Sequence, residues 1–155
     1  MTRPIPPLQT APLFRLSLDI AAAQDLRAPS GRGTIIVPVT GGWFEGARLR
    51  GTVLPDGADW IRAEADHAKV DVRIVLETDD GALIAMAYRG VHTITDAIKT
   101  RLASGEDVPA SDYYFRTAPF FETAAPQYAW MNRMIAVGVG KRTATAVEYD
   151  VFEVL

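Results

Sequence analysis

Cysteine is absent from the 155-residue sequence, and histidine occurs only twice, at His67 and His92. The missing thiols exclude a disulfide framework, a metal site with thiolate ligands and a cysteine nucleophile. The two histidines do not form a spaced set with carboxylates, so we expect no metal site. The sequence also lacks a complete glycine-rich phosphate loop and a Gly-x-Ser-x-Gly elbow. We therefore expect a protein that works without a cofactor.

Long apolar runs and basic runs are missing as well. No apolar run approaches the ~20 residues of a membrane helix, and the N-terminus lacks the apolar core of a secretory signal. The formal net charge is −3, and no cluster of lysine and arginine resembles a nucleic-acid-binding segment. We expect a cytoplasmic protein whose partners include neither membranes nor nucleic acids.

The remaining composition is typical of one globular domain. Of the residues, 48% are hydrophobic and 23% are charged, and the chain is long enough to bury a core. Residues 1–12 hold four of the ten prolines, which predicts an extended arm because proline restricts the backbone and donates no hydrogen bond. The sequence therefore predicts this arm and a single domain over residues 13–155.

Alternation of apolar and polar residues is the dominant local pattern. It is clearest in Lys69–Thr78, where valine, isoleucine and leucine occupy every second position and charged residues most of the others. Residues 78–81, Thr-Asp-Asp-Gly, predict a tight turn, and residues 82–91 return as the partner strand. The other strand-like segments are residues 13–20, 34–39, 47–54, 59–65, 113–123, 134–140 and 144–154.

One segment has helical periodicity. In Thr93–Ser104 apolar residues recur at helical spacing, a threonine provides an N-cap and Gly105 a C-cap. Residues 126–133 are expected to hold a helical turn. About nine short strands with short connections indicate a mainly all-β, antiparallel fold. A closed small β-barrel with the helix packed outside would leave no strand edges exposed, and a two-sheet β-sandwich is the alternative.

Six short strings follow one another in this sequence. They are Gly-Gly-Trp-Phe-Glu-Gly (41–46), Gly-Ala-Asp-Trp (57–60), Leu-Glu-Thr-Asp-Asp-Gly-Ala-Leu-Ile (76–84), Tyr-Tyr-Phe-Arg-Thr (113–117), Tyr-Ala-Trp-Met-Asn-Arg (128–133) and Val-Glu-Tyr-Asp-Val-Phe-Glu-Val (147–154). In this order they resemble the domain-of-unknown-function 3237 family, also called uncharacterised protein family 0311. The resemblance implies a compact β-barrel that often forms a small homo-oligomer, so we expect a dimer. It brings no established general activity.

Tyr113–Arg133 is the stretch richest in groups that could hold a ligand. Tyr114 and Arg116 are two residues apart, so on a strand they share one face. An arginine can bind a carboxylate through two hydrogen bonds, and a tyrosine can donate to an oxyanion or exchange a proton. In the same stretch, Glu122 could act as a base, Trp130 could stack against a ligand and the Asn132 amide could orient it. The alternative is a structural ion pair between Arg116 and Glu122, with the aromatic residues in the core.

Two further groups could face a ligand. Arg73 lies on the charged face of the strand at 69–78, and Arg89 is expected near it on the partner strand. The alternative, which we favour, is that this face points to solvent. Glu45 and Asp59–Trp60 follow glycine-rich turns, where a carboxylate at a barrel rim suits the role of general base. The alternative for Asp59 is a hydrogen bond to the turn backbone.

These patterns predict a small-molecule-binding β-barrel, and more specifically a cofactor-free acid–base enzyme. The reaction would be an isomerisation, cyclisation, hydration or lyase-type cleavage of a small organic compound that carries a carbonyl or carboxylate. The alternatives are a non-catalytic ligand carrier and a structural or assembly module. The predicted catalytic residues are Tyr114, Glu122 and Asp59. The predicted substrate contacts are Arg116, Trp130, Asn132, Glu45, Trp60, Arg73 and Arg89.

Overall fold

Ten strands, one α-helix and two 3₁₀ helices make up the fold, in a computed structural model that describes residues 1–155. The strands are β1 (Thr10–Ile20), β2 (Gln24–Asp25), β3 (Gly33–Glu45), β4 (Arg50–Val53), β5 (Gly57–Ala63), β6 (Ala68–Thr78), β7 (Leu83–His92), β8 (Phe115–Glu122), β9 (Ala136–Arg142) and β10 (Ala146–Val154). The helices are α1 (Asp96–Ala103), η1 (Ala110–Asp112) and η2 (Pro126–Arg133).

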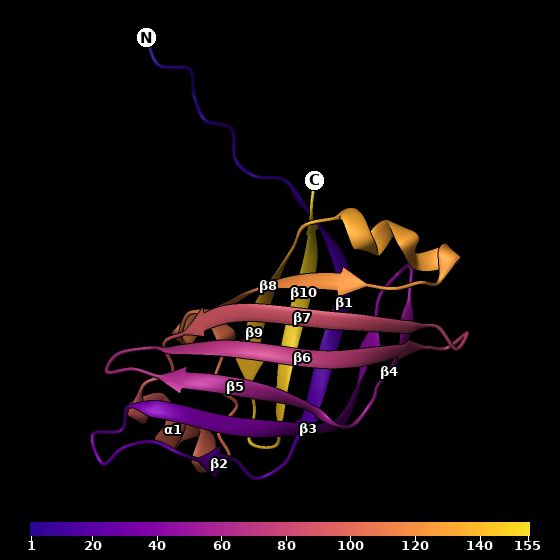
Figure 1. Cartoon of the computed structure of the whole chain (residues 1–155). Coiled ribbons are helices and arrows are strands. Elements are labelled where there is room, and N and C mark those ends of the chain that lie inside the picture. Colours follow the sequence, from indigo (N-terminus) through magenta and orange to yellow (C-terminus); the bar gives the residue numbers. More distant parts are fainter.

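Eight of these strands close into one antiparallel barrel (Figure 1). Around the wall the order is β1-β10-β9-β8-β7-β6-β5-β3, and β3 pairs back with β1. The two short strands are additions, because β4 bridges β3 and β6 beyond the end of β5, and β2 pairs only with β3. The barrel prediction is confirmed, and the sandwich alternative does not apply because the sheet is closed.

Strand β3 closes the barrel by pairing with different neighbours along its length. Its first half pairs with β5, and its second half pairs with β1 and β4. Gly41 and Gly42 lie where the neighbours of β3 change, and Gly42 has a φ of 141°. A Cβ at Gly42 would lie 2.0 Å from the carbonyl oxygen of Ser17 on β1. The backbones of β3 and β1 therefore approach each other closely at Gly42.

The alternating pattern of β6 decides which side chains fill the barrel. Every second residue from Val70 to Leu76 is buried, and the alternate residues Arg73, Val75 and Glu77 are exposed. The favoured interpretation, in which this charged face points to solvent, is confirmed for Arg73 and Glu77. Together with the inward residues of the other strands, these apolar side chains form a core of 29 buried residues. Hydrophobic burial of this continuous interior stabilises the barrel.

The two ends of the barrel are covered differently. Helix α1 lies outside the wall at the end that also carries β2, and η2 lies at the other end, near the start of β1 and the C-terminus (Figure 1). The helix begins at Asp96, three residues after the predicted start, because Thr95 is its N-cap and accepts a hydrogen bond from the Ile98 N–H at 3.3 Å. Gly105, with a φ of 85°, follows its end as predicted.

The predicted turn at 126–133 is present as η2. Asn132 holds it against β8, since its Oδ1 accepts from the Thr123 N–H at 2.8 Å and its Nδ2 donates to the Thr123 carbonyl at 2.9 Å. Residues 1–9 form no strand or helix and are exposed, and β1 starts at Thr10, within the predicted arm. No helix of the chain is long and apolar enough to cross a membrane.

The close approach at Gly42 can be tested with two alanine substitutions. Gly31 has a φ of 83°, but a Cβ added there would meet nothing within 4 Å, so Gly31→Ala reports the cost of the backbone conformation alone. We expect Gly31→Ala to lower the free energy of unfolding by about 1–2 kcal/mol. Gly42→Ala should lower it by more than roughly 3 kcal/mol, because its Cβ also meets the β1 backbone. Urea unfolding measures both, and equal losses would contradict the proposed contact.

Candidate functional site

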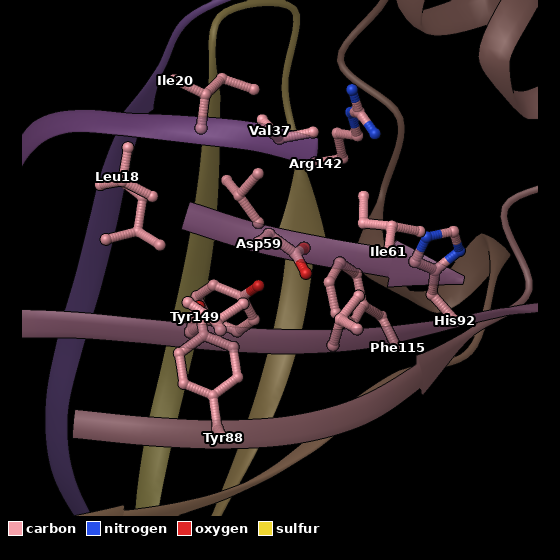
Figure 2. A pocket seen from close by; sticks show the side chains of 14 residues that line it. Leu18, Ile20, Val37, Asp59, Ile61, Tyr88, His92, Phe115, Arg142 and Tyr149 are labelled. Carbon is pink, nitrogen blue, oxygen red and sulfur yellow. The ribbon is translucent and has the colours of Figure 1, made fainter. Parts of the chain in front are cut away.

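A pocket lies inside the barrel, lined by side chains from all eight wall strands (Figure 2). It is narrow, and the free space between its side chains is close to that of a single water molecule, so a larger ligand requires lining side chains to move. Most of its lining is apolar, and five polar or titratable side chains interrupt that lining. The lining residues are Leu18, Ile20, Val37, Val39, Asp59, Ile61, Val70, Val72, Tyr88, His92, Phe115, Arg142, Val147 and Tyr149.

Strand register brings Asp59 and Tyr88 into one row of the barrel wall. Asp59 pairs with Val72 on β6, and Val72 pairs with Tyr88 on β7, so all three side chains face inward at the same level. Asp59 faces inward because β5 alternates, with Ile61 buried and Trp60 exposed. Tyr149 on β10 reaches the same space from across the barrel, and its hydroxyl points toward the Asp59 carboxyl (Figure 2).

The Asp59 carboxyl is the only pocket group with a pKa near neutrality. Burial among apolar side chains raises its pKa to about 7. Two effects oppose the rise: the Asp71 N–H donates to Asp59 Oδ1 at 3.1 Å, and the positive charge of Arg142 favours the ionised carboxylate. The residue remains partly accessible from the pocket. Asp59 can therefore accept and return a proton at physiological pH.

Two tyrosine hydroxyls accompany this carboxyl. The rings of Tyr88 and Tyr149 meet edge to face, with centroids 5.2 Å apart. Burial raises the pKa of both phenols, so both remain protonated donors at neutral pH. The Tyr88 hydroxyl is buried, and the Tyr149 hydroxyl lies near it without making a well-aligned hydrogen bond to it. Because an unpartnered buried hydroxyl costs about 1–3 kcal/mol, this group is available to a ligand or an ordered water.

His92 closes one side of the pocket as a neutral ring. Burial, together with the nearby Arg142 and Lys99 charges, lowers its pKa to about 4. Its Nδ1 accepts a hydrogen bond from the Ile94 N–H at 3.3 Å, which assigns the proton of the neutral ring to Nε2. The ring packs against Phe115 with centroids 5.2 Å apart. His92 therefore shapes the pocket and offers a donor without carrying charge.

The predicted site residues other than Asp59 lie away from this pocket. On β8 the inward positions belong to Phe115, Thr117 and Phe121, so Arg116 and Glu122 point outward. Tyr114 is 53% exposed, and the Arg116 guanidinium lies 5.0 Å from its ring centroid. The predicted inward-facing Tyr114–Arg116 pair is thus corrected to an outward-facing one. The alternative ion pair with Glu122 is also absent from the ion pairs of the chain.

The other predicted substrate contacts are also on the outside. Trp60 and Glu45 are exposed, as is Arg73. Arg89 approaches Asp71 at 3.5 Å in an exposed ion pair. Trp130 stacks under the Arg48 guanidinium at 3.8 Å from its ring centroid, at the end of the barrel covered by η2. Asn132 makes the backbone bridge already described. Of all the predicted site residues, the structure brings only Asp59 into the pocket.

The comparisons with known proteins agree with this fold. The family model described as protein of unknown function (DUF3237) matches residues 8–154. The chain belongs to the DUF3237 family. A UPF0311 protein of Rhodopseudomonas palustris is 33% identical over 154 residues, which cover 97% of this chain and 99% of that protein. The family resemblance seen in the sequence is confirmed.

Solved structures share the DUF3237 barrel. A beta-barrel like protein of Acinetobacter baumannii is 39% identical, with a TM-score of 0.81 over 99% of this chain and 100% of that one. An enzyme from Penicillium herquei is 22% identical, with a TM-score of 0.74 over 100% of this chain and 99% of that one. At 22% identity the second likeness shows the fold alone.

Sequence reasoning missed four polar pocket residues of this DUF3237 chain. Tyr88 and Tyr149 occupy inward positions in alternating strands, two residues from Met86 and Val151 respectively. A hydroxyl-bearing ring within an apolar strand face is the signal that could have identified both. Arg142 and His92, at strand ends, carry no comparable signal. The chain contains no group of three or more histidine, aspartate and glutamate side chains arranged to hold a metal ion.

The raised pKa of Asp59 predicts a pH-dependent stability. The unfolded carboxyl ionises near its ordinary pKa of 3.8, whereas the folded barrel keeps it protonated up to pH about 7. The folded state binds more protons at Asp59 between these values, so the Asp59 contribution to the free energy of unfolding falls as pH rises through this window. His92, whose pKa is lowered from 6.5 to about 4, contributes a rise below pH 6.5, so the net wild-type fall should lie mainly between pH 6.5 and about 7. Asp59→Asn should lack this fall and, above pH about 7, exceed wild type by up to roughly 4 kcal/mol.

Urea unfolding over a series of pH values measures this difference. Glu122→Gln removes a carboxylate from the outer face and serves as the control, with a profile expected to follow the wild type. Parallel profiles of wild type and Asp59→Asn would show that Asp59 titrates at its ordinary pKa in the barrel.

Proposed function

We propose that the interior pocket binds a small organic molecule with a carbonyl or hydroxyl group and catalyses proton transfer on it, with Asp59 as the base. The observation that carries the proposal is the pairing of a buried carboxyl of pKa about 7 with an unpartnered tyrosine hydroxyl in one apolar pocket. Perturbed carboxyls in pockets are common at catalytic sites.

The three inward groups divide the chemistry between them. Ionised Asp59 takes a proton from the carbon next to a carbonyl; the electron pair of that C–H bond forms a C=C bond, and the π pair of the carbonyl moves onto its oxygen. The hydroxyl of Tyr88 or Tyr149 donates a hydrogen bond to this developing oxyanion. Protonated Asp59 then returns the proton to a different atom of the substrate. This sequence balances without a further reactant and gives an isomerisation.

The surroundings of Asp59 favour this role over a structural one. A structural buried carboxylate is normally paired with a cation or with several donors, and Asp59 receives only the Asp71 N–H. The enzyme from Penicillium herquei, whose barrel is alike, supports the view that this fold can carry catalysis. The reacting groups face an apolar, nearly closed space, where electrostatic stabilisation of an oxyanion is stronger than in water.

Proton exchange into carbon acids tests the proposal without knowledge of the natural substrate. A panel of small cyclic and aryl ketones is incubated with the protein in deuterated buffer, and loss of the proton signals next to the carbonyl is followed by NMR. We expect exchange by the wild type, a loss of roughly 10²–10⁴-fold in Asp59→Asn, and a smaller loss in Tyr88→Phe.

Glu122→Gln is the matched control, because Glu122 was the other carboxylate predicted as a base and it lies on the outer face. It should exchange at the wild-type rate. Equal exchange by wild type and Asp59→Asn would contradict the assignment of the base. Ketones that bind in the pocket without any exchange would indicate a ligand carrier in place of an enzyme.

A further inference from the structure

Arg142 differs from every other arginine in the chain in its surroundings. Seven arginines pair with a carboxylate: Arg15, Arg27, Arg48, Arg50, Arg62, Arg89 and Arg101. Of the others, Arg3, Arg32, Arg73, Arg116 and Arg133 are exposed. Arg142 alone is both half-buried and without a carboxylate partner, and it lines the interior pocket.

The backbone of Arg142 is held by hydrogen bonds, whereas its guanidinium forms none within the chain. The residue ends β9 and pairs with Val147 on β10. Its N–H donates to the hydroxyl of buried Tyr113 at 2.8 Å. The neighbouring Lys141 points elsewhere and forms an ion pair with Asp107 at 2.7 Å. The fold therefore holds Arg142 in place and leaves its five guanidinium donors without a partner in the chain.

The position of Arg142 relative to Asp59 defines the two ends of the pocket. In Figure 2 the guanidinium lies above Ile61 and His92 and points away from the two tyrosines, and Asp59 lies between it and Tyr149 in this view. Its positive charge nevertheless reaches the interior, because it favours ionisation of Asp59 and disfavours protonation of His92. Between the polar groups the lining is apolar and includes Phe115 and Val147.

We propose that Arg142 anchors an anionic group of the ligand, so that this pocket selects small organic monoanions with an apolar body and a carbonyl or hydroxyl at the opposite end. This inference names the substrate class of the proposed catalytic pocket and rests on that proposal. A carboxylate fits the guanidinium fork through two parallel hydrogen bonds, while the far oxygen meets the Tyr88 and Tyr149 hydroxyls beside Asp59. The anchor sets the distance at which Asp59 meets the reacting atom.

Matched charged and neutral ligands test the anchor. The probes are 3-(4-hydroxyphenyl)propanoate and its amide, which differ in charge but little in shape, with the phenol suited to the deep end. Binding is measured by calorimetry at low and at physiological ionic strength. We expect the wild type to bind the carboxylate about ten- to a hundred-fold more tightly than the amide, the range of a charge-assisted hydrogen bond.

Three variants test whether Arg142 causes the preference for the carboxylate. Arg142→Gln should lose it and retain binding of the amide, and Arg142→Lys should keep part of it. Arg116→Gln, which removes an exposed arginine without a carboxylate partner from the outer face, should bind like the wild type. A preference that survives in Arg142→Gln, or the absence of any carboxylate preference in the wild type at millimolar concentrations, would overturn the proposal.

The binding and exchange measurements together distinguish a failure of the Arg142 anchor from a failure of the proposed catalysis. If Arg142→Gln loses the preference while Asp59→Asn retains proton exchange, the anchor stands and the assignment of the base fails. If Asp59→Asn loses exchange while Arg142→Gln still prefers the carboxylate, the base stands and the anchor fails.

Discussion

The burial of one carboxyl inside a closed barrel is the constraint on which the candidate site depends. Eight antiparallel strands turn alternate side chains toward a common interior, and nearly all of these are apolar. Asp59 takes one of those inward positions, so burial disfavours its charge more than the Asp71 N–H and the Arg142 charge stabilise it. This placement raises the pKa of the Asp59 carboxyl, and the raised pKa allows the carboxyl to exchange protons near neutral pH.

The same closure determines which other groups can act. Tyr88 shares a row with Asp59 through Val72, and Tyr149 faces them from β10. These strands are far apart in sequence and come together only because the barrel closes. Gly140 contributes to the packing here, since a Cβ at this position would lie 2.5 Å from the Phe115 ring. The pocket is therefore a product of long-range register, and no short segment of the chain contains it.

Sequence reasoning predicted the barrel because its signals are local. Alternation in Lys69–Thr78 has one apolar face, and only that face can form core, so the outward direction of Arg73 followed. The segment around Tyr114 has aromatic residues on both faces, so its sequence did not decide which face points inward. Phe115 and Phe121 are the buried pair, and Tyr114 and Arg116 are outside. Asp59 was identified because a carboxylate stands beside a tryptophan, although it is Ile61, and not Trp60, that shares its inward face.

The remaining site residues depend on contacts that a single sequence does not display. Arg142 is distinctive only because it forms no ion pair with a carboxylate in the folded chain, whereas Lys141 beside it pairs with Asp107. Likewise, the Tyr88 hydroxyl is distinctive only because it is buried without a partner. In both cases the distinctive feature is an interaction that is missing in the folded protein, so the composition and periodicity of the sequence do not indicate it.

The most direct test of this account is the titration of the Asp59 carboxyl itself. Carbon-13 NMR of the side-chain carboxyl, assigned by comparison with Asp59→Asn, follows its ionisation in the folded protein. The account predicts a midpoint near pH 7, where the carboxyl can both take and return a proton. A midpoint near the ordinary value of 3.8 would show that the barrel interior does not perturb Asp59, and the proposed base would be lost.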